Sequence, residues 1–147
     1  MALNREYVGR VFGPTDPYEV SRVKIADFAD AIGEQSELCR DREAAQKAGY
    51  PDVIAPPTFA MVVTMHSTAQ VEADPGLGLD YSMVVHGEQS FSYSRPLHAG
   101  DVVAATTTVE SIRTLGGMSM LVTSTDISTV DGEHVCTAKC TIVERGQ

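Results

Sequence analysis

Cysteine is scarce in this sequence and tryptophan is absent, since the 147 residues include only three cysteines. Three thiols cannot all pair within one chain. Cys136 and Cys140 fall on one predicted strand, where four residues of rise place them about 13 Å apart, beyond disulfide reach. Neither Cys39 nor this pair forms a CxxC motif or a zinc-ligand spacing. The cysteines therefore predict reduced thiols in a cytoplasmic protein, with no metal and no cofactor.

Positive charge is also in short supply, with 11 Lys and Arg against 20 Asp and Glu and a formal net charge of −9. Such a surface repels phosphate backbones and anionic lipids, so we expect no nucleic-acid partner and no membrane partner. The longest stretch without charged residues, 53–71, contains Pro56, Pro57 and several hydroxyl side chains, which is too polar for a membrane span. Residues 1–18 lack the apolar core of a signal peptide.

What the sequence does contain is enough apolar material, 43% of its residues, to form the core of one domain over residues 1–147. The first half is rich in Ala, Glu and Asp at helical spacing. The second half is rich in Val, Thr and Ser at strand spacing. Helices followed by a run of strands predict an α+β fold with helices on one face of an antiparallel sheet.

Three helices are expected in the first half. Apolar residues at helical spacing predict one over 22–32, with Ser21 as its N-cap and Gly33 as its stop. Asp41 caps a second short helix over 42–48. Residues 59–69 are apolar nearly all round, which is typical of a helix that other elements wrap.

The strands are predicted at 7–12 and 18–20, which are short, and at 84–94, 102–115, 118–130 and 133–145, which are long. Gly116-Gly117 and Asp131-Gly132 predict two-residue hairpins, because type I′ turns need positive φ at both positions. Strands of this length must curve, and the apolar helix can fill the inside of the curved sheet. This pattern predicts the hot-dog architecture, a long antiparallel sheet wrapped around a central helix.

Two stretches of the chain carry a family signature. The first comprises residues 28–39 (FADAIGEQSELC), 41–50 (DREAAQKAGY) and 53–59 (VIAPPTF), and the second is 91–101 (FSYSRPLHAGD). They resemble the active-site segment and the strand-to-strand corner of MaoC-like hot-dog dehydratases and R-specific enoyl hydratases. The resemblance spans essentially the whole chain. It is closest to the small actinobacterial subunits related to (3R)-hydroxyacyl-ACP dehydratases (the FAS1-type dehydratase-like N-terminal domain) that lack the Asp/His dyad.

Active members of this superfamily carry Gly-Asp-x-Asn-Pro-x-His in the first stretch, which implies an Asp/His dyad and a nearby backbone N–H donor. Removing water from a 3-hydroxyacyl thioester needs a base at Cα, an acid at the departing hydroxyl and a donor for the thioester oxygen. This chain departs from the pattern at four positions: Glu34 replaces Asp, Ser36 replaces Asn, Glu37 replaces Pro and Cys39 replaces His.

Each departure weakens the implied chemistry. The extra methylene of Glu34 moves its carboxyl group by about an ångström. The Cys39 thiol, with a reference pKa of about 8.5, stays mostly protonated. Pro56-Pro57 occupies the region of the oxyanion donor and has no N–H to offer. We therefore predict that the chain alone does not dehydrate. The alternative, that Glu34 is simply a solvated acid and Cys39 a small buried thiol, stays open at this point.

The resemblance implies a subunit of a (3R)-hydroxyacyl-ACP or -CoA dehydratase of fatty-acid elongation that binds the acyl thioester. In related heterodimers one subunit carries the dyad, while the other completes a double hot dog and forms part of the acyl tunnel. This sequence resembles the second subunit, so we expect a homodimer or a heterodimer with a dyad-bearing hot-dog partner. The alternatives are a stand-alone acyl thioester enzyme, either enoyl hydratase or thioesterase, and a scaffold without an acyl ligand.

Candidate substrate-binding residues lie at the start of the central helix and on the strand 84–94. His86 and Glu88 stand two residues apart, so a regular strand presents them on one face, either as a local polar pair or as the polar end of a cleft. The full candidate set is Pro56, Pro57, Thr58, Phe59, Met61, Val62, His86 and Glu88.

Overall fold

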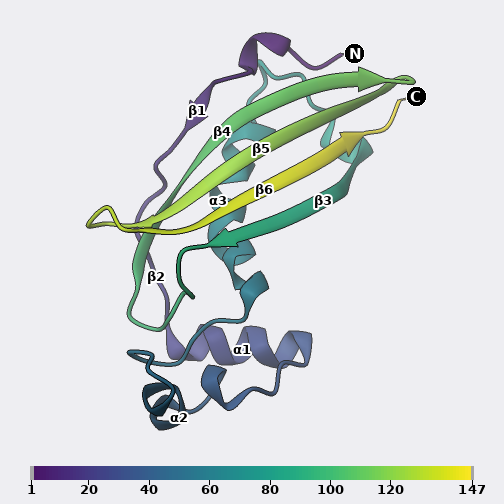
Figure 1. Cartoon of the computed structure of the whole chain (residues 1–147). Coiled ribbons are helices and arrows are strands. Elements are labelled where there is room, and N and C mark those ends of the chain that lie inside the picture. The colour runs from purple at the N-terminus through teal and green to yellow at the C-terminus, as the bar shows by residue number, and fades with distance from the viewer. Residues whose placement is uncertain (1, 147) are drawn as a thin grey trace.

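A large antiparallel sheet with a long helix along one face dominates the computed structural model, which describes residues 2–146 (Figure 1). The strands are β1 (Val11–Phe12), β2 (Tyr18–Glu19), β3 (Val84–Tyr93), β4 (Val102–Leu115), β5 (Met118–Thr129) and β6 (His134–Glu144). The helices are α1 (Arg22–Ile32), α2 (Arg42–Lys47) and α3 (Ala60–Glu72). The sheet order is β1-β4-β5-β6-β3, with β2 also paired to β4. The predicted α+β class and the predicted helix-on-sheet arrangement are confirmed.

The sheet buries one face because its long strands alternate in burial. Along β4 the residues from Val103 to Val109 alternate between buried and half-buried positions, the period of a strand with one face on a core. At the β4–β5 hairpin, Gly116 and Gly117 both have positive φ, at 58° and 80°. This is the geometry of a type I′ turn, as predicted.

The second predicted type I′ turn is wrong. Gly132 has a φ of 94°, whereas Asp131 does not have a positive φ. The Gly132 N–H donates to the Thr129 carbonyl at 2.9 Å and the Thr129 N–H donates to the Glu133 carbonyl at 2.8 Å. The chain therefore crosses from β5 to β6 through a three-residue loop that needs only one left-handed residue, its glycine.

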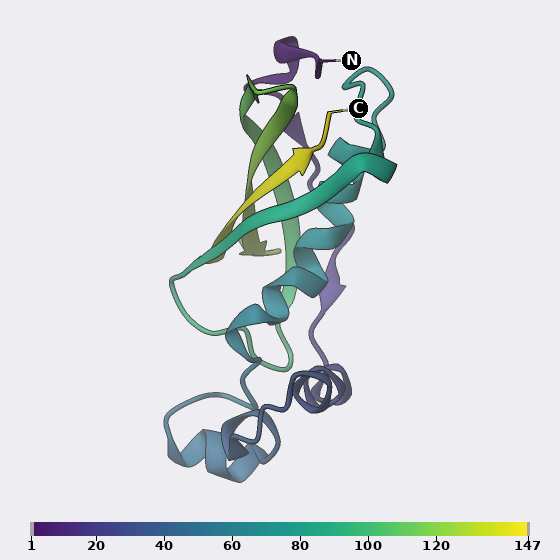
Figure 2. The same cartoon turned by 90° about the vertical axis from the view of Figure 1, so that its right-hand side faces the viewer.

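The helix α3 packs on the sheet through one side only. Its buried residues are Ala60, Val63, Thr64, Ser67 and Val71. Figure 2 shows the helix lying along the sheet, with α1 and α2 beyond its lower end.

The expectation that other elements wrap α3 on every side is wrong for the single chain. Met65 is 60% exposed and His66 is also exposed, because no element of the described chain covers that side of the helix. An apolar helix with one uncovered side has surface left for a partner.

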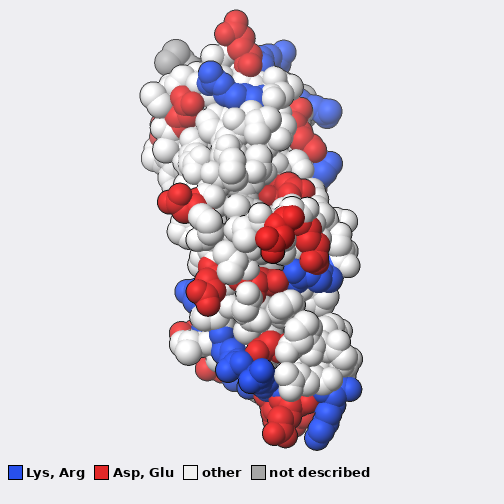
Figure 3. Space-filling model, turned by 90° about the vertical axis from the view of Figure 1, so that its left-hand side faces the viewer, with Lys and Arg blue, Asp and Glu red and all other residues white. Residues whose placement is uncertain are grey.

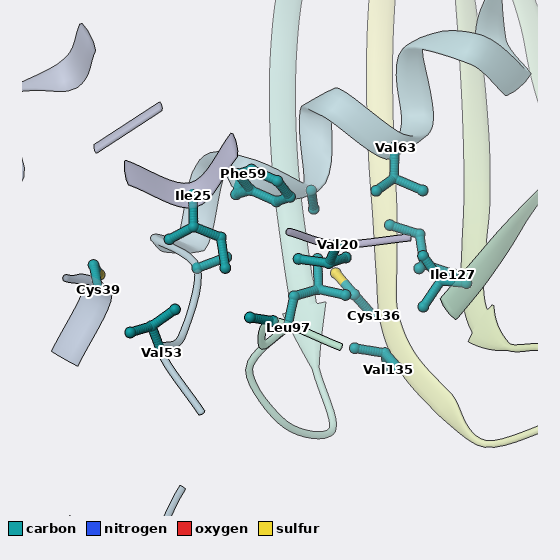
Figure 4. Close-up of a cluster of buried hydrophobic side chains, with 14 of the residues drawn as sticks. Val20, Ile25, Cys39, Val53, Phe59, Val63, Leu97, Ile127, Val135 and Cys136 are labelled. Carbon is teal, nitrogen blue, oxygen red and sulfur yellow. The ribbon is translucent and has the colours of Figure 1, made fainter. Parts of the chain in front are cut away.

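Two clusters of buried side chains form the core. One gathers where α1 and residues 53–55 meet the start of α3, and includes Ile25, Phe59 and Leu97 (Figure 4). The other lies toward the opposite end of the sheet and includes Leu77, Val109 and Leu121. The first cluster ties the helical segment before α3 to the sheet, and it therefore sets the position of that segment.

The helices α1 and α2 begin and end as the sequence predicts. The Ser21 side chain accepts a hydrogen bond from the Lys24 N–H, and Gly33 ends α1 in the left-handed conformation at a φ of 73°. The Asp41 carboxylate accepts from the backbone N–H groups of Glu43 and Ala44 at the start of α2.

The first predicted strand is shorter than expected. Only Val11 and Phe12 pair with β4, whereas Arg5–Tyr7 form a 3₁₀ turn capped by Asn4. The Tyr7 hydroxyl donates to Asp74 at 2.8 Å, which turns its ring toward the end of α3 and away from a strand position. Gly9 and Arg10 still form backbone hydrogen bonds to Val109 of β4, so the departure from the predicted strand is confined to its start.

Candidate functional site

A groove of about 310 Å³ runs between α3 and the β3–β6 edge of the sheet. Met61 and Met65 of α3, Val84 of β3, and Ala138 and Ile142 of β6 contribute its apolar wall. Thioether side chains adapt to irregular apolar ligands, so this wall suits a flexible hydrocarbon chain. We call this space the α3 groove.

Polar side chains also line the α3 groove. Glu72, the last residue of α3, lies there with His86 of β3 and Cys140 of β6. The Cys140 Sγ and the His86 Nε2 are 3.7 Å apart. Burial raises the pKa of Glu72, while the nearby His86 lowers it. Burial and then the charge of Glu72 raise the pKa of Cys140 to about 11, so this thiol is protonated near neutral pH.

The floor of the groove carries a short chain of hydroxyl groups. Thr107 of β4 lies within hydrogen-bond distance of Ser67 of α3, at 2.6 Å, and of Thr125 of β5, at 2.7 Å. Ser67 and Thr107 are fully buried, and Thr125 lines the groove. These buried hydroxyls hydrogen-bond to one another. The polar residues of α3 that pack on the sheet therefore keep hydrogen-bond partners after they lose water.

The structure separates His86 from Glu88, so the expectation that they share one face of a strand is wrong. The pairing of β3 with β6 shifts between His86, opposite Ile142, and Glu88, opposite Thr141. Gly87 is the extra residue of a β-bulge, and one extra residue turns the following side chains to the other face. His86 lines the α3 groove, whereas Glu88 lies on the opposite face of the sheet, beside Lys139.

The positions of the implied dyad lie close together in the segment between α1 and α3. Glu34 accepts a hydrogen bond from the Ser36 N–H at 2.9 Å, and its own carbonyl accepts from Arg40. Cys39 is 4% exposed and belongs to the core cluster beside Val53 (Figure 4). Burial raises the pKa of the Cys39 thiol and the Glu34 charge raises it further, against a smaller opposing effect of Arg40. A neutral buried thiol is a poor proton acceptor.

The segment is fastened to its surroundings by paired charges and backbone bonds. Arg22 of α1 binds both carboxylate oxygens of Asp52, at 3.0 and 2.7 Å, and the Arg42 Nε lies 3.5 Å from the same side chain. The Arg22 hydrogen bond, with smaller contributions from the Val53 N–H and the charges of both arginines, lowers the pKa of Asp52 to about 2 against the opposing effect of burial. The Ala55 N–H donates to the Leu97 carbonyl at 2.8 Å. These bonds hold the segment against the corner before β4.

The candidate binding residues at the start of α3 divide between the core and the surface. Pro56 and Phe59 are buried, and Phe59 packs edge-on against Phe28 with ring centroids 5.4 Å apart. Pro57 and Thr58 are exposed, Met61 lines the α3 groove, and Val62 packs at the edge of the core.

Pro57 also lines a second, mostly apolar pocket of about 360 Å³ together with Ile54, Tyr93 and Pro96. The Tyr93 hydroxyl donates to the Pro57 carbonyl, which joins the end of β3 to the start of α3.

No sequence pattern indicated Glu72, Cys140 or Thr125 as residues of this groove. These residues come from three different elements, and nothing in their spacing links them. One signal was present, because Glu72 is a charged residue at the end of an otherwise apolar stretch. Over residues 2–146 the His, Cys, Asp and Glu side chains form no group of three suited to a metal ion.

Charged side chains are spread over the face of the molecule that Figure 3 shows. Acidic and basic side chains are interspersed there, with broad uncharged areas between them, and no continuous basic stripe is visible on that face. Within residues 2–146, no helix is long and apolar enough to cross a membrane.

Comparisons with known proteins agree with this architecture. The sequence pattern of the FAS1-like dehydratase domain region matches residues 6–138. A UPF0336 protein of Thermobifida fusca is 53% identical over 146 residues, covering 99% of this chain and 96% of the relative. A UPF0336 protein of Saccharopolyspora erythraea is 51% identical, covering 99% and 94%.

Solved structures show the same fold. The C-terminally truncated HadBC complex of Mycobacterium tuberculosis, a (3R)-hydroxyacyl-ACP dehydratase, superposes with a TM-score of 0.84 at 26% identity, covering 93% of this chain and 96% of that chain. A MaoC-like dehydratase superposes with a TM-score of 0.87 at 28% identity, covering 95% of this chain and 42% of that chain. The predicted hot-dog fold and the predicted superfamily are confirmed. The chain belongs to the family of the FAS1-like dehydratase domain region and has the fold of the MaoC-like hot-dog dehydratases.

Proposed function

We propose that this chain is a subunit of a (3R)-hydroxyacyl-ACP or -CoA dehydratase, which binds the acyl thioester and supports a dyad-bearing hot-dog partner. The observation that carries the proposal is the contrast between an open apolar groove and dyad positions that have no competent base. The chain keeps the space for the acyl chain of a substrate and lacks the groups that would act on it.

The dyad positions argue against independent catalysis. A general base must accept a proton near neutral pH, and the raised pKa of the buried Cys39 keeps that side chain as a neutral thiol. Glu34 accepts a hydrogen bond from the backbone of Ser36, which holds the carboxylate within its own turn. A second subunit therefore has to supply the acid and the base.

The proposed partner contacts the β3 edge and the uncovered side of α3. β3 is a terminal strand of the sheet, and its unpaired backbone groups offer hydrogen bonds to a strand of another chain. Met65, on the uncovered side of α3, is 60% exposed, and Val85 of the edge strand β3 is 41% exposed. A two-fold pair with another hot-dog chain would cover both and close the α3 groove from solvent, which gives a double hot dog.

The test is to purify the full chain alone and together with a dyad-bearing MaoC-like protein encoded by the same genome, and to measure hydration of a 2-enoyl-CoA. We expect no turnover by the chain alone, a heterodimer in solution, and higher activity of the complex than of the partner alone. Glu34→Gln serves as the matched control and is expected to leave this activity unchanged.

Three results would overturn the proposal. Hydration by the chain alone that Glu34→Gln abolishes would assign a stand-alone hydratase. Release of free thiol from saturated acyl thioesters by the chain alone would assign a thioesterase. A stable homodimer that ignores the dyad-bearing protein would contradict the proposed pairing.

A further inference from the structure

A hydroxyl, an imidazole and a carboxylate meet at one end of the sheet, where β6 lies between β3 and β5. Ser94 follows the last residue of β3, His134 is the first residue of β6, and Asp126 lies on β5. The Ser94 Oγ is 2.6 Å from the His134 Nδ1, and the His134 Nε2 is 3.6 Å from the Asp126 Oδ2. The three groups are therefore joined in the order that nucleophilic catalysis by serine uses.

Neighbouring residues hold Ser94 beside His134. The Ser94 N–H donates to the Val135 carbonyl at 2.8 Å. The Arg95 guanidinium, next in the chain, forms an ion pair with Glu133, the residue before His134. These two bonds fasten the turn after β3 to the start of β6, and they keep the hydroxyl within reach of the imidazole.

The surroundings of the imidazole indicate which nitrogen carries its proton. The His134 Nε2 faces two acceptors, the Thr137 Oγ1 at 2.8 Å and the Asp126 carboxylate. A proton on Nε2 leaves Nδ1 free to accept the hydrogen bond of the Ser94 hydroxyl. The Asp126 Oδ1 accepts from the Ser128 hydroxyl, which holds the carboxylate in place beside the ring.

Ser94 also lines an apolar pocket, the space of about 360 Å³ beside Pro57 and Pro96. A mostly apolar pocket of this size can take a small hydrocarbon group. The backbone N–H of Arg95 forms no hydrogen bond within residues 2–146. This N–H can therefore donate to a carbonyl oxygen that gains negative charge when Ser94 attacks its carbon.

We propose that Ser94, His134 and Asp126 form a second site, which hydrolyses small carboxylic esters through an acyl-serine. Ser94 and His134 are its catalytic residues, and Asp126 is a positioning residue. The inference goes beyond the proposed function and does not rest on it, because these residues lie outside the α3 groove and outside the segment 33–59.

The reaction needs only water besides the ester. The Ser94 Oγ attacks the carbonyl carbon while its proton passes to the His134 Nδ1, and the bond to the alcohol oxygen then breaks as the alcohol leaves with that proton. Water attacks the acyl-serine through the same base, which releases the carboxylic acid and returns a proton to Ser94. The Asp126 carboxylate stabilises the imidazolium formed in each half of the reaction.

The site is partly open to solvent, which limits its expected rate. The His134 and Asp126 side chains are 39% and 51% exposed, and water weakens the attraction between an imidazolium and a carboxylate. We therefore expect slow turnover of activated esters.

The experiment follows the hydrolysis of p-nitrophenyl acetate and p-nitrophenyl butyrate by the full chain, together with labelling by a fluorophosphonate, which reacts with activated serines. We expect turnover and a single label, assigned to Ser94 by peptide mass spectrometry. Ser94→Ala and His134→Ala should each lower kcat/KM about a hundredfold and abolish the label. Asp126→Asn should lower kcat/KM about tenfold and slow the labelling, because the ring keeps its base but loses the charge beside it.

Two control variants separate this site from general surface chemistry. Ser90→Ala removes another exposed serine of β3, which lies opposite Lys139, and should leave both rates unchanged. His66→Ala removes an exposed imidazole of α3 and should also leave them unchanged. Thermal unfolding of every variant checks that it is folded.

Turnover and labelling that persist in Ser94→Ala would overturn this inference, and so would the absence of both in the wild type. A loss in His66→Ala equal to that in His134→Ala would assign the rate to exposed imidazoles and would overturn it as well. The p-nitrophenyl esters release no thiol, and their hydrolysis is measured without the dyad-bearing partner. This inference and the proposed function can therefore fail separately.

Discussion

The segment between α1 and α3 and the α3 groove differ in how their residues pack. The segment, residues 33–59, is fixed at a few points: Cys39 and Phe59 are core residues, and Asp52 forms ion pairs with two arginines. The groove keeps about 310 Å³ of open space and an uncovered side. The comparison teaches that one region of this fold is held by core contacts and ion pairs while its neighbour keeps open space.

The largest effect is expected from Phe59→Ala, which tests whether the segment is structural. Phe59 is 0% exposed, so the truncation should lower the free energy of unfolding by about 3–5 kcal/mol. Met65→Ala, on the uncovered side of α3, should change it by about 0.5 kcal/mol or less in the single chain. Urea unfolding of both variants measures the difference, and equal losses would break the comparison.

Asp52→Asn should have the next largest effect, because it removes the charge that holds α1 and α2 to the segment. We expect a loss of about 1–2 kcal/mol, kept modest because both arginine side chains are more than half exposed. Thermal unfolding of the variant and of the wild type at neutral pH measures this loss.

The same side chain predicts a pH dependence. The folded pKa of Asp52 is about 2, below its ordinary 3.8, so its contribution is fully present above about pH 5 and is lost as the pH falls from 4 toward 2. Over that range the wild type should lose stability faster than Asp52→Asn. Parallel pH curves for the two proteins would show that the pair carries no stability.

Thiol reactivity gives a finer comparison of the two regions. In the native protein Cys140 should react with iodoacetamide while the buried Cys39 and Cys136 do not. Because the Cys140 pKa is about 11, its rate should rise about tenfold per pH unit below that value. Peptide mass spectrometry assigns the sites, and all three should react in urea. Faster native labelling of Cys39 would show that the segment is open.

The smallest effect is expected from Glu34→Gln, which should change the hydratase activity of the complex less than twofold. The amide oxygen can still accept the Ser36 N–H, so the turn should survive. Initial rates of hydration with the dyad-bearing partner measure the effect. A loss of tenfold or more would show that Glu34 takes part in catalysis. That result would contradict the proposed difference between the segment and the α3 groove.

Sequence reasoning succeeded where the signal is local. Ser21, Gly33 and Asp41 begin or end helices as predicted, and Gly116-Gly117 forms the expected turn, because each acts on backbone within a few residues of itself. It failed at Asp131-Gly132, where a three-residue loop satisfies the same hairpin with a single left-handed glycine.

The candidate site shows the same division. The resemblance located Glu34, Cys39 and Met61, but a period of two assigned Glu88 to the wrong face of the strand. Gly87 was visible in the sequence, and a glycine inside a strand is compatible with a bulge, yet only the pairing with β6 shows that it forms one. Glu72 and Cys140 lie near His86 because α3, β3 and β6 meet there.

By itself, the order of amino acids determined the class of fold, the caps that begin α1 and α2, and the long strands, because each depends on composition or on neighbours in the chain. The tertiary structure alone decided which side of α3 stays uncovered and which polar groups line the groove. Those features depend on the register between strands and on helix packing, where a single extra residue moves a side chain from one face to the other.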